Sequence, residues 1–353
     1  MDTISVAFDM TFPNRHGGGG GVYARRLAEA LEKRSDVTVS VVEGPARSGL
    51  AGTGRWLLGG ARRALEAGRP ALLHCPSFVA PWAVPVPFVV TVHDAAARRF
   101  PADHPLEWRV YDRAVLAGRL RAAARIITDS EFARREVVDV YGVAPGRVVV
   151  TPLAVDPAYL DPVATPDEAG CDLLFPGAPI GRKNLEAVLD CMAQAGPEGR
   201  LGRATLAISG ARADAFPGHA RLIRSLGLDA RVRWLGKVPF DQMPRLLAGA
   251  GVVVYPSLYE GFGLPPLEAM AVGTPVVASD RASLPEVLGD AALRVDPTDR
   301  RALSEALEAA LTRPEVREDL RERGRRRARE FSWDRCAELT LDVYRDVLRE
   351  RAA

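Results

Sequence analysis

Short apolar segments alternate with longer segments of helical periodicity, and this alternation occurs twice along the chain. The short segments are rich in Val, Ile and Leu, whereas the longer ones repeat their apolar residues at a spacing of three or four. This order is typical of parallel strands covered by helices. We therefore predict an α/β protein with two doubly wound, Rossmann-like domains. Strands are expected at 4–8, 37–42, 71–74, 88–92, 125–128 and 148–151, and then at 172–175, 205–209, 231–235, 252–255, 275–278 and 293–295.

A break in this pattern predicts the domain boundary. Residues 156–170 hold three prolines and four acidic residues without sustained periodicity, which is typical of a linker. The predicted domains are then 1–160 and 171–330, a division that fits a chain of 353 residues. Ligands of doubly wound folds bind beyond the carboxyl ends of the strands, so we expect the site in a cleft between the two domains.

Composition excludes several classes of protein. The net charge of +2 argues against a nucleic-acid-binding chain. Four widely spaced cysteines without a C-x-x-C pair argue against a zinc site or a disulfide scaffold and fit a reducing compartment. The sequence shows no signal-peptide pattern and no spanning apolar run. It also lacks an Asp-x-Asp motif, so we expect a cytoplasmic enzyme that requires no metal or other cofactor.

The most informative segment is 255–270. A strand ends at Tyr255, and a glycine-containing loop and two prolines lead into a helix. Unpaired N–H groups at the start of that helix would form an anion site. The carboxylates of Glu260 and Glu268 flank it, and carboxylates accept hydrogen bonds from vicinal hydroxyls such as those of a sugar or a ribose. The alternative is an ordinary strand–loop–helix connection with two solvated glutamates. The glycines, the prolines and the preceding strand all favour a ligand-binding site instead.

A second basic segment, 177–184, follows the first strand of the second domain. It contains Gly177, Arg182 and Lys183 just before a predicted helix. Cations at a helix N-terminus oppose the helix dipole, which favours a bound anion over solvated charges.

Two features of the first domain are candidates for the other side of the site. His93 and Asp94 follow a predicted strand, where a histidine is better placed for function than most structural histidines. The glycine run 17–21, which includes Gly20 and Gly21, opens a predicted helix and allows close approach of a ligand, although such a run is also typical of a mobile loop.

Segment 257–271, Ser-Leu-Tyr-Glu-Gly-Phe-Gly-Leu-Pro-Pro-Leu-Glu-Ala-Met-Ala, resembles the E-x7-E signature of retaining glycosyltransferases of family 4, which adopt the GT-B fold. The resemblance extends to five further segments: 91–94, 129–132, 181–184, 273–279 and 283–287. It implies an N-terminal acceptor-binding domain, to which a C-terminal helix at 331–353 returns, and a C-terminal donor-binding domain.

The resemblance also implies roles for single residues. Glu260 would contact the donor sugar and Glu268 the ribose, while Arg182 and Lys183 would neutralise the diphosphate. The remaining donor-binding positions implied are Gly20, Gly21, Gly177, Lys237, Val238, Gly261, Phe262, Gly263 and Leu264.

On the acceptor side, His93 would lie near the reacting centre and Asp94 would bind acceptor hydroxyls. Many relatives carry an arginine where this chain has Ala178, and this departure places more of the phosphate charge on Arg182 and Lys183 or on another cation. Relatives often carry an arginine at the position of Val22 as well, so the chain lacks that side chain for a contact between the glycine run and the donor phosphates.

The implied activity is retaining, metal-independent transfer of a hexose from a nucleotide sugar, GDP-mannose or a UDP-sugar, to a hydroxyl of a saccharide, a lipid-linked glycan or a small natural product. The leaving phosphate would help to deprotonate the acceptor. Alternatives are a nucleotide-sugar epimerase or hydrolase of the same fold, and a non-catalytic nucleotide-sugar-binding module. Basic amphipathic segments at 55–58 and 108–125 also leave open an enzyme at the inner membrane face that acts on a lipid acceptor.

Overall fold

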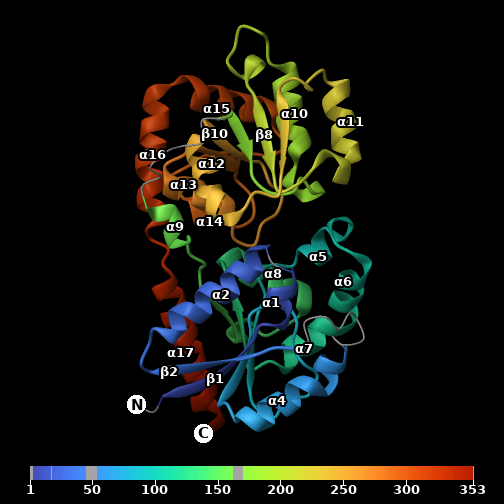
Figure 1. Ribbon diagram of the computed structural model, residues 1–353, viewed down its shortest axis with the longest axis vertical. Coiled ribbons are helices and arrows are strands. Elements are labelled where there is room, and N and C mark those ends of the chain that lie inside the picture. The colour runs from blue at the N-terminus through green and yellow to red at the C-terminus, as the bar shows by residue number, and fades with distance from the viewer. Residues whose placement is uncertain (1–2, 17, 45–53, 162–169, 353) are drawn as a thin grey trace. The chain divides into compact units, whose positions relative to one another are not determined.

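The computed structural model describes residues 3–16, 18–44, 54–161 and 170–352 of the chain (Figure 1). It divides into two compact units. The first unit comprises Met1–Ala154 and Ser332–Ala353, and the second comprises Val155–Phe331. Each unit is built on one parallel sheet.

The first unit has a six-stranded sheet in the order β2-β1-β3-β4-β5-β6. Its strands are β1 (Ile4–Asp9), β2 (Val37–Val42), β3 (Leu72–Cys75), β4 (Phe88–Thr91), β5 (Arg125–Thr128) and β6 (Val148–Val150). Its helices are α1 (Thr11–His16), α2 (Gly18–Glu32), α4 (Ala61–Gly68), α5 (Ala96–Arg99), α6 (Leu106–Tyr111), α7 (Ala117–Ala122), α8 (Glu131–Tyr141) and α17 (Trp333–Ala352). Every residue of β3 and β4 is buried, including the polar His74 and Thr91, so these strands lack the alternation of apolar and solvated residues that is typical of a half-exposed sheet.

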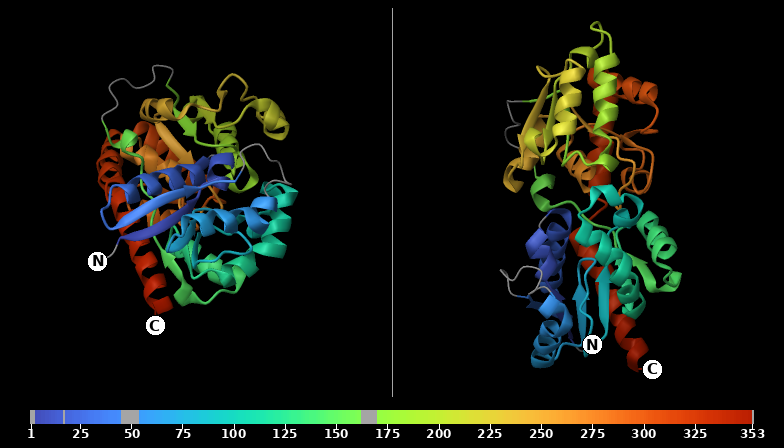
Figure 2. Two further views of the ribbon diagram at one scale, coloured as in Figure 1. Left: turned by 60° about the horizontal axis from the view of Figure 1, so that its bottom comes forward. Right: turned by 90° about the vertical axis from the view of Figure 1, so that its right-hand side faces the viewer.

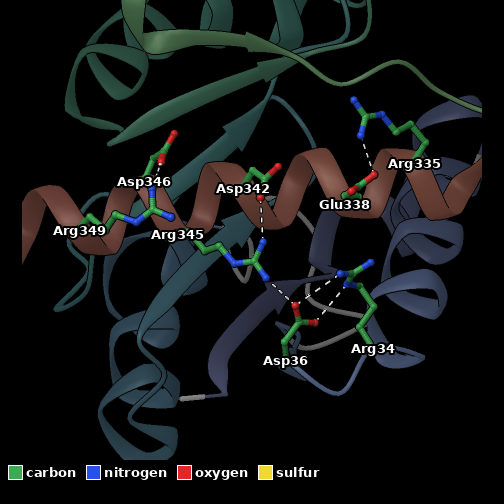
Figure 3. A network of polar contacts seen from close by, with 8 residues as sticks. All are labelled: Arg34, Asp36, Arg335, Glu338, Asp342, Arg345, Asp346 and Arg349. Atoms are coloured by element: carbon green, nitrogen blue, oxygen red, sulfur yellow. Dashed lines mark hydrogen bonds and ion pairs between the residues drawn. The ribbon is translucent and has the colours of Figure 1, made fainter. Parts of the chain in front are cut away.

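Helix α17 returns from the second unit to pack on the first. Its Tyr344 hydroxyl forms a 2.6 Å hydrogen bond with Nδ1 of the buried His74 on β3. Its Arg345 donates to Asp36 at 2.6 Å, and Arg34 contacts the same carboxylate (Figure 3). These contacts join α17 to β3 and to the residues just before β2.

The second unit has a six-stranded sheet in the order β12-β11-β10-β7-β8-β9. Its strands are β7 (Leu173–Phe175), β8 (Leu206–Ser209), β9 (Val232–Gly236), β10 (Val252–Tyr255), β11 (Val276–Ser279) and β12 (Leu293–Val295). Its helices, which Figure 2 shows from two further sides, are α9 (Pro157–Leu160), α10 (Leu185–Gln194), α11 (Pro217–Ser225), α12 (Met243–Gly249), α13 (Leu264–Val272), α14 (Leu284–Leu288), α15 (Arg300–Thr312) and α16 (Pro314–Ala328).

The register of this sheet determines where the site forms. Strands β7 and β10 are parallel neighbours, with Val252 opposite Leu173 and Val253 opposite Leu174. Their carboxyl ends therefore lie side by side, and the segment after β7 emerges next to the segment after β10.

All twelve predicted strands are present, and their ends agree with the prediction to within one residue. The predicted linker at 156–170 differs in its first part, because the unit boundary lies between Ala154 and Val155 and residues 157–160 form α9. The Asp156 carboxylate caps this helix by accepting from the backbone N–H of Ala158, and Tyr159 is buried. Residues 162–169 of the predicted linker lie outside the described residues.

Residues 18–21 of the glycine run are helical, which agrees with the helix predicted to open there rather than with the alternative of a mobile loop. Gly18, Gly20 and Gly21 belong to the first turn of α2, whose Tyr23, Ala24 and Leu27 are buried, so packing of the later turns extends the helix back through the glycines. Gly17 lies outside the described residues. None of the described helices combines the length and the apolar character needed to cross a bilayer.

Candidate functional site

The loop between β10 and α13 is held in a single conformation by its neighbours. Gly263, the residue before α13, has a φ of 102°, and a Cβ there would lie 2.5 Å from Cδ2 of Leu284. The Ser283 hydroxyl donates to the carbonyl oxygens of Glu260 and Phe262, both at 2.9 Å. Backbone geometry and a buried serine thus fix the direction in which Glu260 leaves the loop.

The start of α13 offers fewer N–H groups than the sequence pattern suggested. The helix begins at Leu264, and the next two residues are Pro265 and Pro266, which have no N–H. This leaves the N–H groups of Phe262, Gly263 and Leu264, rather than a full helical turn, as the candidate donors of the predicted anion site.

Four side chains form one polar cluster, which we call the donor cluster: Arg182 and Lys183 from the segment after β7, Tyr255 from the end of β10 and Glu260 from the loop that follows β10. Arg182 donates through Nη1 to Oε1 of Glu260 at 2.9 Å. The Tyr255 hydroxyl donates to the same oxygen at 2.9 Å and accepts from Nζ of Lys183 at 3.1 Å. The carboxylate thus pairs with Arg182 directly and with Lys183 through a buried phenol.

The pKa values of the donor cluster reflect this coupling. Burial disfavours the charged form of Glu260, but the charges of Arg182 and Lys183, together with the hydroxyl groups of Tyr255 and Ser257, outweigh burial and hold the pKa of Glu260 below its usual range. Burial lowers the pKa of the Lys183 ammonium against the opposing effect of Glu260. Glu260 is therefore an ionised carboxylate that can only accept hydrogen bonds, as a sugar hydroxyl requires.

The basic segment is tied directly to the loop after β10. Gly177 has a φ of 95°, and a Cβ there would lie 2.8 Å from Nζ of Lys183. Asn184 donates through Nδ2 to the carbonyl oxygen of Pro256 at 3.2 Å, and the backbone N–H of Leu258 donates to the carbonyl oxygen of Arg182 at 2.7 Å. Glycine leaves room for the lysine, and the asparagine fixes the two segments to each other.

Three other predicted donor-binding residues lie apart from the donor cluster. Glu268 lies in α13, where burial and the nearby Asp156 carboxylate raise its pKa to about 7. Lys237 and Val238 follow β9, at the edge of the sheet two strands from β7, and Lys237 is exposed.

In the first unit, His93 is paired with an aspartate that the sequence analysis did not single out. Nδ1 of His93 lies 2.7 Å from Oδ2 of Asp129, which is buried at the end of β5. Burial disfavours protonation of His93, but the Asp129 carboxylate outweighs burial and raises the pKa of His93. The rings of Tyr23 and Phe78 pack edge-on against the imidazole.

The other imidazole nitrogen of His93 is directed toward the glycine run. Nε2 is buried and has no hydrogen-bond partner among the described residues. A Cβ at Gly20 would lie 3.6 Å from it. A histidine oriented through one nitrogen, with the other unpaired, is typical of a functional imidazole.

Asp94 and Gly21 each have a local structural explanation. Asp94 accepts through Oδ1 from the backbone N–H of Ala96 at 2.9 Å, at the start of α5. A Cβ at Gly21 would lie 2.9 Å from the carbonyl oxygen of Pro13, so close packing of α2 on α1 requires glycine there. Neither explanation assigns a ligand to these residues.

Comparisons with known proteins agree with this architecture. Residues 166–327 match the family model described as glycosyl transferases group 1, and residues 17–159 match the one described as glycosyltransferase family 4. O-antigen chain mannosyltransferase B of Escherichia coli is 34% identical over 291 residues, which cover 80% of this chain and 76% of that protein. This chain belongs to the group 1, family 4 glycosyltransferases. It is therefore a hexosyltransferase of that type.

Solved structures with low sequence identity share the GT-B fold. Sucrose-phosphate synthase from Thermosynechococcus elongatus has a TM-score of 0.79 at 21% identity, over 98% of this chain and 100% of that one. The Anabaena protein HepE, solved in complex with UDP and glucose, has a TM-score of 0.74 at 17% identity, over 97% of this chain and 100% of that one.

Proposed function

We propose that this glycosyltransferase moves a hexose from a nucleotide sugar to an acceptor hydroxyl with retention of anomeric configuration and without a metal ion. The donor cluster is the observation that carries the proposal. It joins two cations, suited to a diphosphate, to an ionised carboxylate, suited to sugar hydroxyls, at the carboxyl ends of two neighbouring strands.

In the proposed reaction the bond between the anomeric carbon and the diphosphate oxygen breaks, and a bond to the acceptor oxygen forms on the same face. The acceptor proton passes to the leaving phosphate, and the nucleoside diphosphate departs. Negative charge grows on the diphosphate as this bond breaks, and the cations of Arg182 and Lys183 stabilise it there. Burial strengthens this effect because the local dielectric constant is lower than that of water.

Glu268 and the first unit have secondary roles in this proposal. The Glu268 carboxylate accepts hydrogen bonds from the ribose hydroxyls, and Lys237 and Val238 lie beside the nucleotide base. His93 contacts the donor sugar or the acceptor near the reacting centre, and Asp94 contacts the acceptor. The O-antigen mannosyltransferase relative makes mannose the first donor sugar to test and a saccharide the first acceptor.

A screen of nucleoside diphosphates and nucleotide sugars by thermal shift, followed by transfer assays with the stabilising donors, tests the proposal. We expect GDP-mannose or a UDP-sugar to raise the melting temperature and to be used in the presence of EDTA. NMR of the product is expected to show the donor's anomeric configuration. A strict metal requirement or an inverted product would contradict the mechanism, and donor isomerisation without an acceptor would favour the epimerase alternative.

A further inference from the structure

The first unit contains a cavity of about 130 Å³ that the reaction described above does not use. Its walls are mainly aromatic and aliphatic, with Phe78, Trp108, Tyr111, Leu116 and Tyr141 among the residues that line it. For comparison, an apolar protein cavity of about 150 Å³ accommodates benzene. The space therefore fits a group about the size of one ring.

Most polar atoms of the walls are already paired within the protein. The Tyr141 hydroxyl donates to Oδ1 of Asp112 at 2.6 Å, and Arg98 donates to Oδ2 of the same carboxylate. The Tyr111 hydroxyl donates to the carbonyl oxygen of Phe78 at 3.4 Å. His104 is different, because its buried Nε2 has no partner among the described residues. An occupant would thus meet apolar walls and few polar groups.

The cavity is adjacent to the candidate reacting centre of the same unit. Phe78 lines the cavity and also packs against His93, with the two ring centroids 5.7 Å apart. Asp94, the residue after His93, lines the cavity as well. A molecule held at His93 could therefore place its neighbouring group in this space.

We propose that the cavity binds an apolar, ring-sized group of the acceptor, next to the hydroxyl that is glycosylated. The inference rests on the proposed function, since it assigns the cavity to the acceptor. A sugar ring fits less well, because most of its hydroxyls would lose water without gaining a partner from walls in which most polar atoms, Nε2 of His104 excepted, are already bonded. Pockets of this kind bind through apolar contact and use a few polar groups for orientation, a role that His104 can fill.

Saturation-transfer NMR with two matched probes, a phenyl hexoside and the methyl hexoside of the same sugar, tests the inference without a donor. We expect saturation of the phenyl protons and about tenfold tighter binding of the phenyl compound, a typical discrimination for an apolar pocket. Equal binding of the two probes, or no saturation of the phenyl protons, would overturn the proposal. This comparison uses the unaltered chain, so its outcome does not depend on how a variant folds.

A second experiment substitutes Ala97, which lines the cavity. Ala97→Leu fills the space, and Ala114→Leu adds the same volume at an exposed position. We expect only Ala97→Leu to abolish the preference for the phenyl compound, with nucleoside diphosphate binding unchanged in both variants. A preference that survives Ala97→Leu would place the phenyl group elsewhere. If the unaltered chain does not bind nucleoside diphosphates, that result would instead contradict the proposed function.

Discussion

The donor cluster of the second unit and the His93 region of the first differ in how they are built. The donor cluster is highly charged, and its four side chains come from two short segments at the carboxyl ends of neighbouring strands. The His93 region is built around the pair of His93 and Asp129, whose members lie 36 residues apart, and aromatic rings pack against the imidazole. A diphosphate demands the same charges from any protein that binds it, whereas an acceptor does not. The charged residues of the donor cluster can therefore be predicted from a sequence motif, whereas the pairing in the His93 region can be identified only once the fold is known.

Substitution of Lys183 tests the role of charge in the donor cluster and has the largest expected effect. Lys183→Ala removes a half-buried cation from the donor cluster, so we expect the transfer rate to fall by about 10²–10³-fold. Calorimetry should also show weaker nucleoside diphosphate binding. Lys33→Ala, at an exposed position of the first unit, is the control and should change neither quantity. If the affinity of Lys183→Ala for nucleoside diphosphate is unchanged, Lys183 does not belong to the donor site.

Asp129→Asn tests whether the aspartate positions His93. We expect a loss of about 10²-fold in kcat, because the imidazole loses its charged partner. The carboxylate raises the pKa of His93, so its removal should shift the corresponding limb of the pH–rate profile to lower pH.

A structural role alone would lower activity without moving that limb. Asp139→Asn removes an exposed carboxylate of α8 that pairs with Arg99, and the profile should remain in place in this variant.

Two neighbouring glycines test whether the unpaired nitrogen of His93 faces a ligand. In Gly20→Ala the new methyl group would lie 3.6 Å from Nε2, whereas at Gly19 nothing lies within 4 Å. We expect Gly20→Ala to reduce transfer by roughly tenfold and Gly19→Ala to leave it unchanged. Both changes favour the helix, so equal effects on activity would show that helix stability, rather than access to His93, decides the result.

Substitution of Glu268 has the smallest expected effect, which is on the free energy of unfolding. The Glu268 pKa of about 7 exceeds the ordinary value of 4.5, so the folded chain retains a proton that the unfolded chain loses, and stability falls as the pH rises through this window. Glu268→Gln should therefore increase the free energy of unfolding by about 1–3 kcal/mol at pH 8 and by little near pH 4.5. Urea denaturation at both pH values measures this difference, and an equal change at both would contradict the assignment.

Much of the fold followed from local patterns. The strands could be predicted because parallel strands buried on both faces are short and uninterrupted in their apolar character, as in Val252–Tyr255. At the start of α2 the sequence does not decide between a helix and a mobile loop, because glycines carry no apolar pattern and become helical there only through packing of the later turns. Helix α9 was missed for a related reason, since four residues are too few for periodicity.

The candidate site shows the same division. Arg182, Lys183 and Glu260 lie in segments with recognisable spacing, and the structure brings them together. Tyr255 was treated only as the end of a strand, since its position between Lys183 and Glu260 depends on strand pairing. Asp129 follows β5, the neighbour of β4, and a search of adjacent strand ends could have paired it with His93. Lys237 and Val238 rest on family resemblance alone.

The central claim is that Glu260 acts on the sugar while the neighbouring cations hold the diphosphate. Transfer rate and nucleoside diphosphate affinity, measured together on Glu260→Gln, test it most directly. We predict that transfer falls by about 10²-fold, because the charged acceptor of hydrogen bonds is lost, while the calorimetric Kd changes by less than about threefold. Unchanged turnover, or a parallel loss of transfer and affinity, would contradict this division of roles.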